Sequence, residues 1–360
     1  MKPFDRRSAI LGGLDVGHLK GLEIGPLHNP MVRKSDGFVL YVDHADTEFI
    51  KNANRSPLFN NDDICDIDIV WGDRPLRELV PHPMDYVVAS HVIEHVPDMI
   101  GWLIDLDGAL TADGVICLAI PDRRFTFDLR RPESTAGEMI EAFLMRVRRP
   151  PARHLFDQIA LQAAFPKAEA WEDDMLSQTT PEEKHLATAR CMAERVTATT
   201  DYVDAHCWVF TPETFLNVAE RLSGVGLFPF TIDYFHPTEY GDYVFHVRLR
   251  KSSDKARVAE SIGDARQALK EWPPEQAYRD MQLVKVYEQK LPEPCYWNLM
   301  RELDARRKEL DEQRRQFEDE MILLRDQTAY LRDMVGQYEN STSWRLTKPV
   351  RWLGGKLKRK

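Results

Sequence analysis

The sequence predicts an α/β fold, in which helices cover a mostly parallel sheet. Two observations support this prediction. Short apolar runs rich in β-branched residues recur along the first third of the chain, as in strands that are buried on both faces. Between two of these runs, apolar residues recur at helical spacing, so strand and helix alternate as the crossover connections of a parallel sheet require.

Seven strands are expected. The first five are residues 19–25, 38–43, 64–71, 85–90 and 114–121. The helix before the fifth strand is indicated by apolar residues from Ile100 to Leu110, and Gly114 ends its pattern. The last two strands, residues 228–235 and 243–250, are separated by a short turn and predict an antiparallel hairpin that closes the sheet.

Residues 122–205 interrupt the strand pattern. They contain no strand-like run, are punctuated by prolines and carry clusters of arginine, so we interpret them as a helical or loop-like insertion that contacts substrate. A helix is expected to follow over residues 211–226, because Thr211 suits its N-cap and Pro212 its first turn.

Three further segments follow the hairpin. Residues 252–295 are predicted to form a helical linker. Over residues 296–336, a Leu or Phe recurs every seven residues from Leu303 to Leu331, which predicts a long helix. The residues at the other core position of the heptad are mostly polar, so the pattern does not decide whether this helix forms a coiled coil. Residues 337–360 form a tail with seven Lys and Arg, no Asp or Glu after residue 340, and interleaved tryptophans.

Charge and cysteine content exclude several classes of protein. The net charge of −10 argues against a nucleic-acid binder, since that affinity rests on clustered cations. Five cysteines are odd in number and show no C-x-x-C spacing, which disfavours a disulfide framework and a thiolate zinc site. No apolar run approaches the ~18 residues of a spanning helix, and no signal peptide precedes the domain, so we expect a cytoplasmic protein.

The first predicted strand leads into a loop that suits a nucleoside. Gly25 lets the backbone approach a ligand, and Asp43, at the end of the second strand, can accept hydrogen bonds from ribose hydroxyls. The loop lacks the three glycines of a dinucleotide site, which disfavours an NAD or nucleotide-sugar enzyme. S-Adenosylmethionine has the adenosine without the pyrophosphate and fits better. A simple turn is the open alternative.

Five segments together resemble a known family. They are LEIGPLHNP, YVDHAD, DYVVASHVIEHVPD, GVICLAIPDRRFTFDLRRPEST and HCWVFTPETF. In this order they resemble the class I, Rossmann-like S-adenosylmethionine-dependent methyltransferases, and most closely a bacterial set found with surface-polysaccharide genes. The resemblance covers about residues 17–250 and implies a methyltransferase domain over residues 1–251. It also implies a seven-stranded, mostly parallel sheet with the cofactor above the carboxyl ends of its strands.

The resemblance assigns cofactor-binding roles to six residues: Glu23, Gly25, Pro26, Asp43, Asp73 and Ser90. The first three would line the methionine side, Asp43 would hold the ribose, and Asp73 would lie near the adenine. Ser90 and His91 would close the end of the fourth strand. The sequence departs from the family between the first two strands, where the short interval leaves room for a short helix only.

Methyl transfer to a hydroxyl requires alignment of the acceptor and removal of its proton. The candidate bases are His206, Asp122 and His91, and we favour His206 paired with Asp122, because both flank the expected mouth of the site. His95 is expected to be structural.

Three residues after the fifth strand are candidates for acceptor binding: Arg124, Asp128 and Arg131. Arginine can clamp a carboxylate or phosphate, and Asp128 can bond sugar hydroxyls. A solvated loop is the alternative. No metal-ligand cluster stands out in the sequence.

These observations predict an enzyme that methylates a sugar hydroxyl on a nucleotide sugar or growing glycan in bacterial surface-glycan biosynthesis. The segment STSWRLTKPVRWL resembles the ending of glycan-assembly enzymes. The tail over residues 341–360 therefore predicts docking on an anionic inner-membrane surface or a protein, and residues 296–336 predict a homo-oligomer or a glycan-assembly partner. Open alternatives are a non-catalytic scaffold with a degenerate methyltransferase domain and a methyltransferase for an unrelated small molecule.

Overall fold

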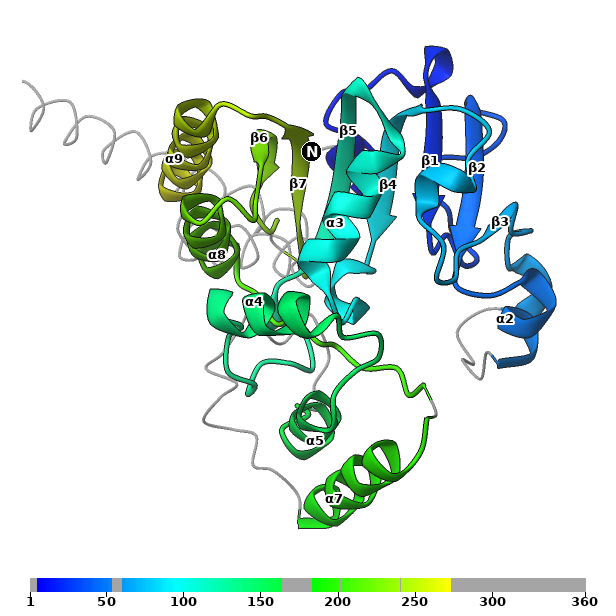
Figure 1. Cartoon of the computed structure of the whole chain (residues 1–360), viewed down its shortest axis with the longest axis vertical. Helices are drawn as coiled ribbons and strands as arrows, with labels where there is room; N and C mark the ends of the chain where they lie inside the picture. Colours follow the sequence, from blue (N-terminus) through cyan, green and yellow to red (C-terminus); the bar gives the residue numbers. More distant parts are fainter. Residues whose placement is uncertain (1–4, 54–59, 164–182, 201, 240, 273–360) are drawn as a thin grey trace, which may run out of the picture. The chain divides into compact units, whose positions relative to one another are not determined.

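The computed structural model describes residues 5–53, 60–163, 183–200, 202–239 and 241–272. Their centre is a seven-stranded sheet with the order β3-β2-β1-β4-β5-β7-β6 (Figure 1). Its strands are β1 (Lys20–Ile24), β2 (Phe38–Asp43), β3 (Ile69–Val70), β4 (Met84–Ser90), β5 (Leu110–Pro121), β6 (Phe230–His236) and β7 (Val244–Lys251). The first five pair in parallel, and β7 runs antiparallel to both β5 and β6. The predicted Rossmann-like fold with a closing antiparallel hairpin is confirmed.

The central strands are buried on both faces, as their apolar sequences predict. In β4, Val87 and Ala89 face one hydrophobic cluster, and Tyr86 and Val88 face another. The first cluster includes residues of α3 (Met99–Gly108), α4 (Ala136–Met145), α8 (Pro212–Gly224) and α9 (Lys255–Glu271). The second includes residues of α1 (Arg6–Leu11) and of the segments around β1 and β2. The sheet therefore forms the middle layer of the described residues.

The helices expected before the fifth strand, over residues 211–226 and after residue 252 are present as α3, α8 and the first part of the predicted linker, α9. Helix α8 begins after Thr211, whose side chain accepts a hydrogen bond from the Thr214 N–H, and it has Pro212 at its first position, as predicted. Within residues 122–205, the described part is mainly helical and contains α4, α5 (Ala152–Ala160) and α7 (Glu183–Ala198), of which α5 and α7 pack together.

The structure differs from the sequence prediction at several places. The strand expected over residues 64–71 is reduced to β3, because the Cys65 N–H donates to Leu27 O and the Ile67 N–H donates to Thr47 Oγ1, so neither N–H pairs with a neighbouring strand. β5 begins at Leu110, which was expected in the preceding helix, because Leu110 pairs with Met84 of β4. The predicted domain end at residue 251 falls inside the folded unit, because α9 packs on β6 and α8 and buries Val258 and Ile262.

The remaining predictions for the C-terminal part lie outside the described residues. These are the rest of the helical linker after residue 272, the long helix over residues 296–336 and the basic tail. Helix α2 (Thr47–Ala53) lies between β2 and β3 in the chain and is labelled in Figure 1. None of the described helices is long and apolar enough to cross a bilayer.

Candidate active site

The ends of four parallel strands lie at one edge of the sheet. Because β2, β1, β4 and β5 are neighbours in that order, the residues that follow them are brought together. These residues are Gly25 after β1, Asp43 at the end of β2, Ser90 at the end of β4 and Asp122 after β5. In open α/β sheets, ligands bind at this carboxyl edge. The structure therefore places these four predicted site residues at the edge where a ligand site is expected.

Gly25 allows the loop after β1 to approach the segment after β4. Its φ is +65°, a left-handed conformation that favours glycine, and its N–H donates to Val42 O at 2.9 Å. A Cβ built on Gly25 would lie 3.1 Å from Cγ2 of Val92. The Gly25 backbone therefore lies close to the segment after β4, with no side chain in between, and Pro26 continues the turn.

Glu23 fixes the loop after β1 by hydrogen bonds to its backbone. Its side chain is buried, and its two oxygens accept hydrogen bonds from the N–H groups of Met31 at 2.7 Å and Val32 at 2.8 Å. Burial raises the pKa of Glu23 to about 7, against the opposing effect of these two bonds. In the structure Glu23 contacts the loop backbone, and its expected contact with a cofactor stays a prediction. No helix forms between β1 and β2, where a short one was expected.

Asp43 occupies the predicted position at the end of β2. Its side chain is 13% exposed, and Oδ1 accepts from the N–H of His44 at 2.7 Å and contacts His44 Nδ1 at 2.6 Å. This contact raises the pKa of His44. Asp73 lies exposed in the turn after β3, and Ser90 is half-buried at the end of β4. Asp43 and Ser90 end their strands and Asp73 follows β3, and the roles of all three in cofactor binding stay predictions.

A cavity of about 330 Å³ opens beside the ends of β4 and β5. Four of its lining residues are titratable or polar groups on the segments that follow β4 and precede α8. The lining residues are His91, Glu94, His95, Pro121, Phe125, Thr126, Phe127, Ala163, His206 and Tyr243. The cavity brings together two predicted catalytic residues, His91 and His206, from segments more than a hundred positions apart in the chain.

His206 is supported by a carboxylate, but not by the predicted one. Its Nδ1 lies 2.5 Å from Oδ2 of Asp128, and Arg131 bridges the pair by donating to Asp128 Oδ1 at 2.7 Å and to His206 O at 2.8 Å. Asp128 is buried, which would raise its pKa, but the contacts with His206 and Arg131 hold that pKa below its ordinary value. The candidates for acceptor binding, Asp128 and Arg131, thus support the histidine.

Asp122, the expected partner of His206, is bonded elsewhere. Its carboxylate is fully buried. It accepts hydrogen bonds from two side-chain nitrogens of Arg124, at 3.0 and 2.7 Å, and from Thr238 Oγ1 at 2.8 Å. These bonds join the end of β5 to the segment between β6 and β7. The predicted pairing of His206 with Asp122 is therefore wrong, because the nearer carboxylate, Asp128, occupies Nδ1 of the histidine.

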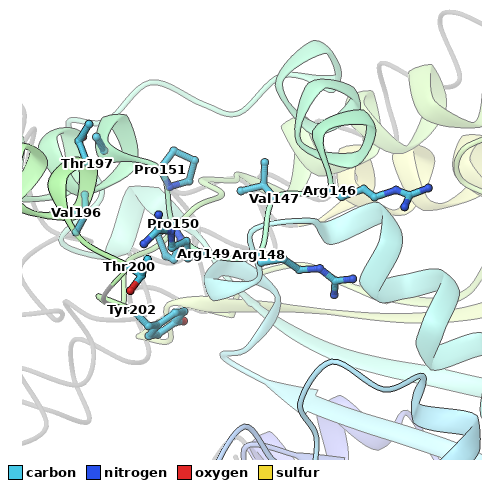
Figure 2. Close-up of a pocket in the computed structure, with 11 residues that line it drawn as sticks. Arg146, Val147, Arg148, Arg149, Pro150, Pro151, Val196, Thr197, Thr200 and Tyr202 are labelled. Atoms are coloured by element: carbon cyan, nitrogen blue, oxygen red, sulfur yellow. The ribbon is translucent and has the colours of Figure 1, made fainter.

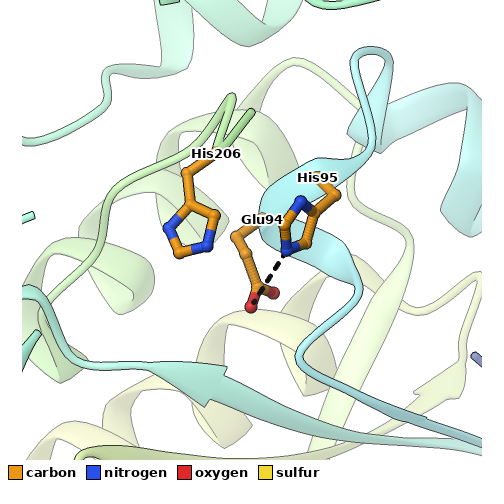
Figure 3. A group of neighbouring side chains, drawn as sticks. All are labelled: Glu94, His95 and His206. Carbon is orange, nitrogen blue, oxygen red and sulfur yellow. Dashed lines mark ion pairs between the residues drawn. The ribbon is translucent and has the colours of Figure 1, made fainter. Parts of the chain in front are cut away.

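Two cavity residues were missed or undervalued in the sequence. Glu94 is 1% exposed, and neither of its oxygens has a hydrogen-bond partner among the described residues. His91 Nδ1 and His95 Nε2 face its Oε1 at 3.5 and 4.0 Å. Burial would raise the pKa of Glu94, but the nearby histidines lower it. Figure 3 shows Glu94, His95 and His206 pointing toward one another.

His95 has a carboxylate partner of its own. Its Nδ1 lies 2.9 Å from Oδ1 of Asp204, and its ring packs edge-on against His206 with the centroids 4.6 Å apart. Burial would lower the pKa of His95, but the bond to Asp204 and the charge of Glu94 raise it. In the sequence, Glu94 and His95 follow the fourth predicted strand and could have indicated this cluster, but we expected His95 to be structural.

A larger cavity of about 670 Å³ lies among the insertion helices (Figure 2). It is lined by the segment from Arg146 to Ala152 and by residues at the end of α7, with Tyr202. None of the predicted site residues lines it. Its charged lining residues are Arg146, Arg148 and Arg149, and the described lining includes no histidine or carboxylate. The chemistry is therefore assigned to the smaller cavity at the sheet edge.

Comparisons with known proteins find similarity in solved structures. Neither a protein-family model nor a curated protein matches the sequence. A Rhodobacter sphaeroides protein provisionally named a Zn-dependent alcohol dehydrogenase aligns at 13% identity with a TM-score of 0.41, over 70% of this chain and 92% of that one. An S-adenosylmethionine-dependent methyltransferase from Mesorhizobium loti aligns at 16% identity with a TM-score of 0.33, over 68% of this chain and 96% of that one.

A third structure, the DhpI–SAH complex, aligns at 16% identity with a TM-score of 0.31, over 69% of this chain and 85% of that one. TM-scores at this level carry no argument about activity.

Proposed function

We propose that this chain is an S-adenosylmethionine-dependent methyltransferase that transfers a methyl group to a hydroxyl of a sugar. The observation that carries the proposal is the cavity beside β4 and β5, whose wall presents His206 supported by the buried carboxylate of Asp128. This cavity opens at the carboxyl edge, next to the strand ends that suit a nucleoside.

The residues after β1 and β2 fit an adenosine without a pyrophosphate. Gly25 presents backbone without a side chain, and Pro26 has no N–H to offer a phosphate. Both contacts from His44 go to Oδ1 of Asp43, so ribose hydroxyls would donate to Oδ2. Glu23 keeps the loop in place through the backbone of Met31 and Val32.

S-Adenosylmethionine, when bound, supplies a methyl group on a positively charged sulfur. As the C–O bond forms and the C–S bond breaks, the acceptor hydroxyl loses its proton, and the site must accept it. Asp128 accepts from Nδ1 of His206, so in the neutral ring Nε2 is the nitrogen that can take a proton. Asp128 also stabilises the imidazolium that results.

A sugar acceptor suits the cavity better than a phosphate or carboxylate. Arg124 and Arg131, the expected anion clamps, form ion pairs with Asp122 and Asp128. The lining instead offers the aromatic rings of Phe125, Phe127 and Tyr243, on which a sugar could pack, together with imidazoles that bond hydroxyls. The resemblance to polysaccharide-associated proteins supports the same substrate class.

The proposal places the enzyme in bacterial surface-glycan biosynthesis, at the cytoplasmic face of the inner membrane. The support for this location is the basic, tryptophan-bearing tail over residues 341–360. Residues 296–336 would join the enzyme to a second copy or to a glycan-assembly partner through the heptad pattern.

Calorimetric titration with S-adenosylmethionine tests the cofactor site. Asp43→Ala is expected to raise the dissociation constant by roughly 10- to 150-fold, because it removes hydrogen bonds to a charged group that are worth about 1.5 to 3 kcal/mol. Asp113→Ala is the matched control, because Asp113 is exposed near the start of β5, at the opposite edge of the sheet. An unchanged constant in Asp43→Ala would remove Asp43 from the site.

A further inference from the structure

We infer that Glu94, His95 and His206 form a binding site for one divalent transition-metal ion, of which Zn²⁺ is the prototype, inside the acceptor cavity. One potential ligand atom from each residue lies within 4.8 Å of the others. The cofactor residues Gly25, Asp43 and Ser90 are not part of this cluster. The inference deepens the proposed function and rests on it for the role of the ion in methyl transfer.

The first observation is that the carboxylate of Glu94 is buried without a hydrogen-bond donor among the described residues. A carboxylate removed from water requires hydrogen bonds, an ion pair or a metal, since burial without compensation is costly. Glu94 is 1% exposed and lines the cavity, and no described residue donates a hydrogen bond to either oxygen. The imidazoles of His91 and His95 face it at 3.5 and 4.0 Å, which is too far for strong bonds. A cation between Glu94 and the rings would satisfy both oxygens.

The second observation is the orientation of the two imidazoles. His95 Nδ1 contacts Asp204 and His206 Nδ1 contacts Asp128, at 2.9 and 2.5 Å. A carboxylate on Nδ1 fixes the proton there and leaves Nε2 with the lone pair that a metal needs. Metal-binding histidines almost always have such an outer partner. Both rings thus have the carboxylate–histidine arrangement of a metal site, independently of Glu94.

The geometry requires a modest closure. Bonds of about 2.0 to 2.2 Å from zinc to nitrogen and oxygen imply ligand separations of about 3.4 Å in a tetrahedral site. His95 Nε2 and Glu94 Oε1 are 4.0 Å apart, so shifts of roughly 1 Å in the side-chain atoms would bring the ligands to the separation that zinc requires. Phe127 packs on His206 with ring centroids 4.7 Å apart and keeps that ring near the cluster.

The ligand set indicates the class of ion. Two imidazoles and one carboxylate bind zinc or another first-row divalent ion, with at least one position left open. The open position would face the cavity, where the acceptor hydroxyl is expected. An ion there would lower the pKa of a bound hydroxyl, whose proton would pass to solvent, and His206 would serve as a ligand of the ion. This changes the role of His206 from base to ligand when metal is bound.

The test uses the full-length chain, freed of metal with a chelator and titrated with CoCl₂. We expect one Co²⁺ per chain, visible absorption bands of protein-bound Co²⁺, and displacement of Co²⁺ by ZnCl₂. Glu94→Gln keeps the size of the side chain and removes its charge, and it should weaken Co²⁺ binding at least 100-fold. A chain that binds no Co²⁺ would overturn the inference.

A second variant guards against misfolding of the first. Asp204 is an exposed outer partner, so Asp204→Asn should fold normally and weaken Co²⁺ binding 10- to 100-fold through the loss of support for His95. Asp62→Asn is the control, because Asp62 is exposed and lines neither the cavity nor the cluster; this variant should bind Co²⁺ as the unchanged chain does. Binding that survives both Glu94→Gln and Asp204→Asn would refute the assignment of these ligands.

The same samples separate this inference from the proposed function. If Co²⁺ binds through Glu94 while S-adenosylmethionine does not bind, the metal site stands and the methyltransferase proposal fails. If S-adenosylmethionine binds and no metal binds, the proposed function stands and His206 keeps the role of base.

Discussion

Glu23 shows how one buried carboxylate can replace backbone hydrogen bonds. The loop after β1 contains no helix, and the N–H groups of Met31 and Val32 would lack partners without the two oxygens of Glu23. The carboxylate therefore positions Gly25 and Pro26 indirectly, by holding the far side of their loop. The sequence indicated that Glu23 is important, but its partners became visible only in the tertiary structure.

The raised pKa of Glu23 predicts a pH-dependent stability. Its folded-state pKa of about 7 exceeds the ordinary value of 4.5, so this group stabilises the fold below pH 4.5 and the effect is lost as pH rises to 7. The shift corresponds to about 3 kcal/mol in the free energy of unfolding. Glu23→Gln should lose this slope in urea unfolding at a series of pH values.

The control for this measurement is Glu48→Gln, because Glu48 is exposed on α2. It should retain the pH slope of the unchanged chain. Equal slopes in Glu23→Gln and the unchanged chain would contradict the assigned cause, because other titrating groups would then account for the whole pH dependence.

At the scale of elements, local sequence signals placed α8 well and the third strand poorly. Thr211 and Pro212 begin α8 because the cap and the first turn depend on neighbouring residues only. The segment of residues 64–71 has the apolar pattern of a strand, yet the Cys65 N–H donates to Leu27 O in the loop after β1 and the Ile67 N–H donates to the side chain of Thr47. Those partners are distant in sequence, so the pattern alone could not exclude them.

Helix α4 offers a test of capping in the insertion. Thr135 Oγ1 accepts from the Glu138 N–H, and the Glu138 side chain accepts from the Thr135 N–H, which forms a complete capping box. Thr135→Ala should lower the free energy of unfolding by about 1 kcal/mol. The measurement is urea unfolding of both chains at one pH.

Thr135→Ser is the matched control, because serine keeps the hydroxyl and caps equally well. It should unfold close to the unchanged chain. A loss of the same size in both variants would assign the effect to the methyl group of threonine and not to the cap.

At the scale of the whole molecule, charge is divided unevenly along the chain. The net charge is −10, although the last twenty residues carry seven cations and no anion. Deleting residues 338–360 should abolish binding to vesicles of anionic lipid, because the loss of basic and aromatic residues removes the attraction to the headgroups. Flotation of the two chains with such vesicles measures this effect.

The truncated chain serves as its own control for the active site, since its affinity for S-adenosylmethionine should not change. Added salt should weaken the vesicle binding of the full chain, because screening reduces attraction between surface charges. Undiminished flotation of the truncated chain would show that another surface binds the lipid.

The sequence by itself determined the strand segments and the helices α3, α8 and α9, the strand-end positions of Gly25 and Asp43, and the candidacy of His206. These features depend on apolar periodicity and on residue types whose conformational preferences act locally. The tertiary structure decided the partners: Asp128 and not Asp122 for His206, the loop backbone for Glu23, and Glu94 with His95 for the cavity. Hydrogen bonds and charge compensation join residues far apart in the chain, so only folding selects among the available carboxylates.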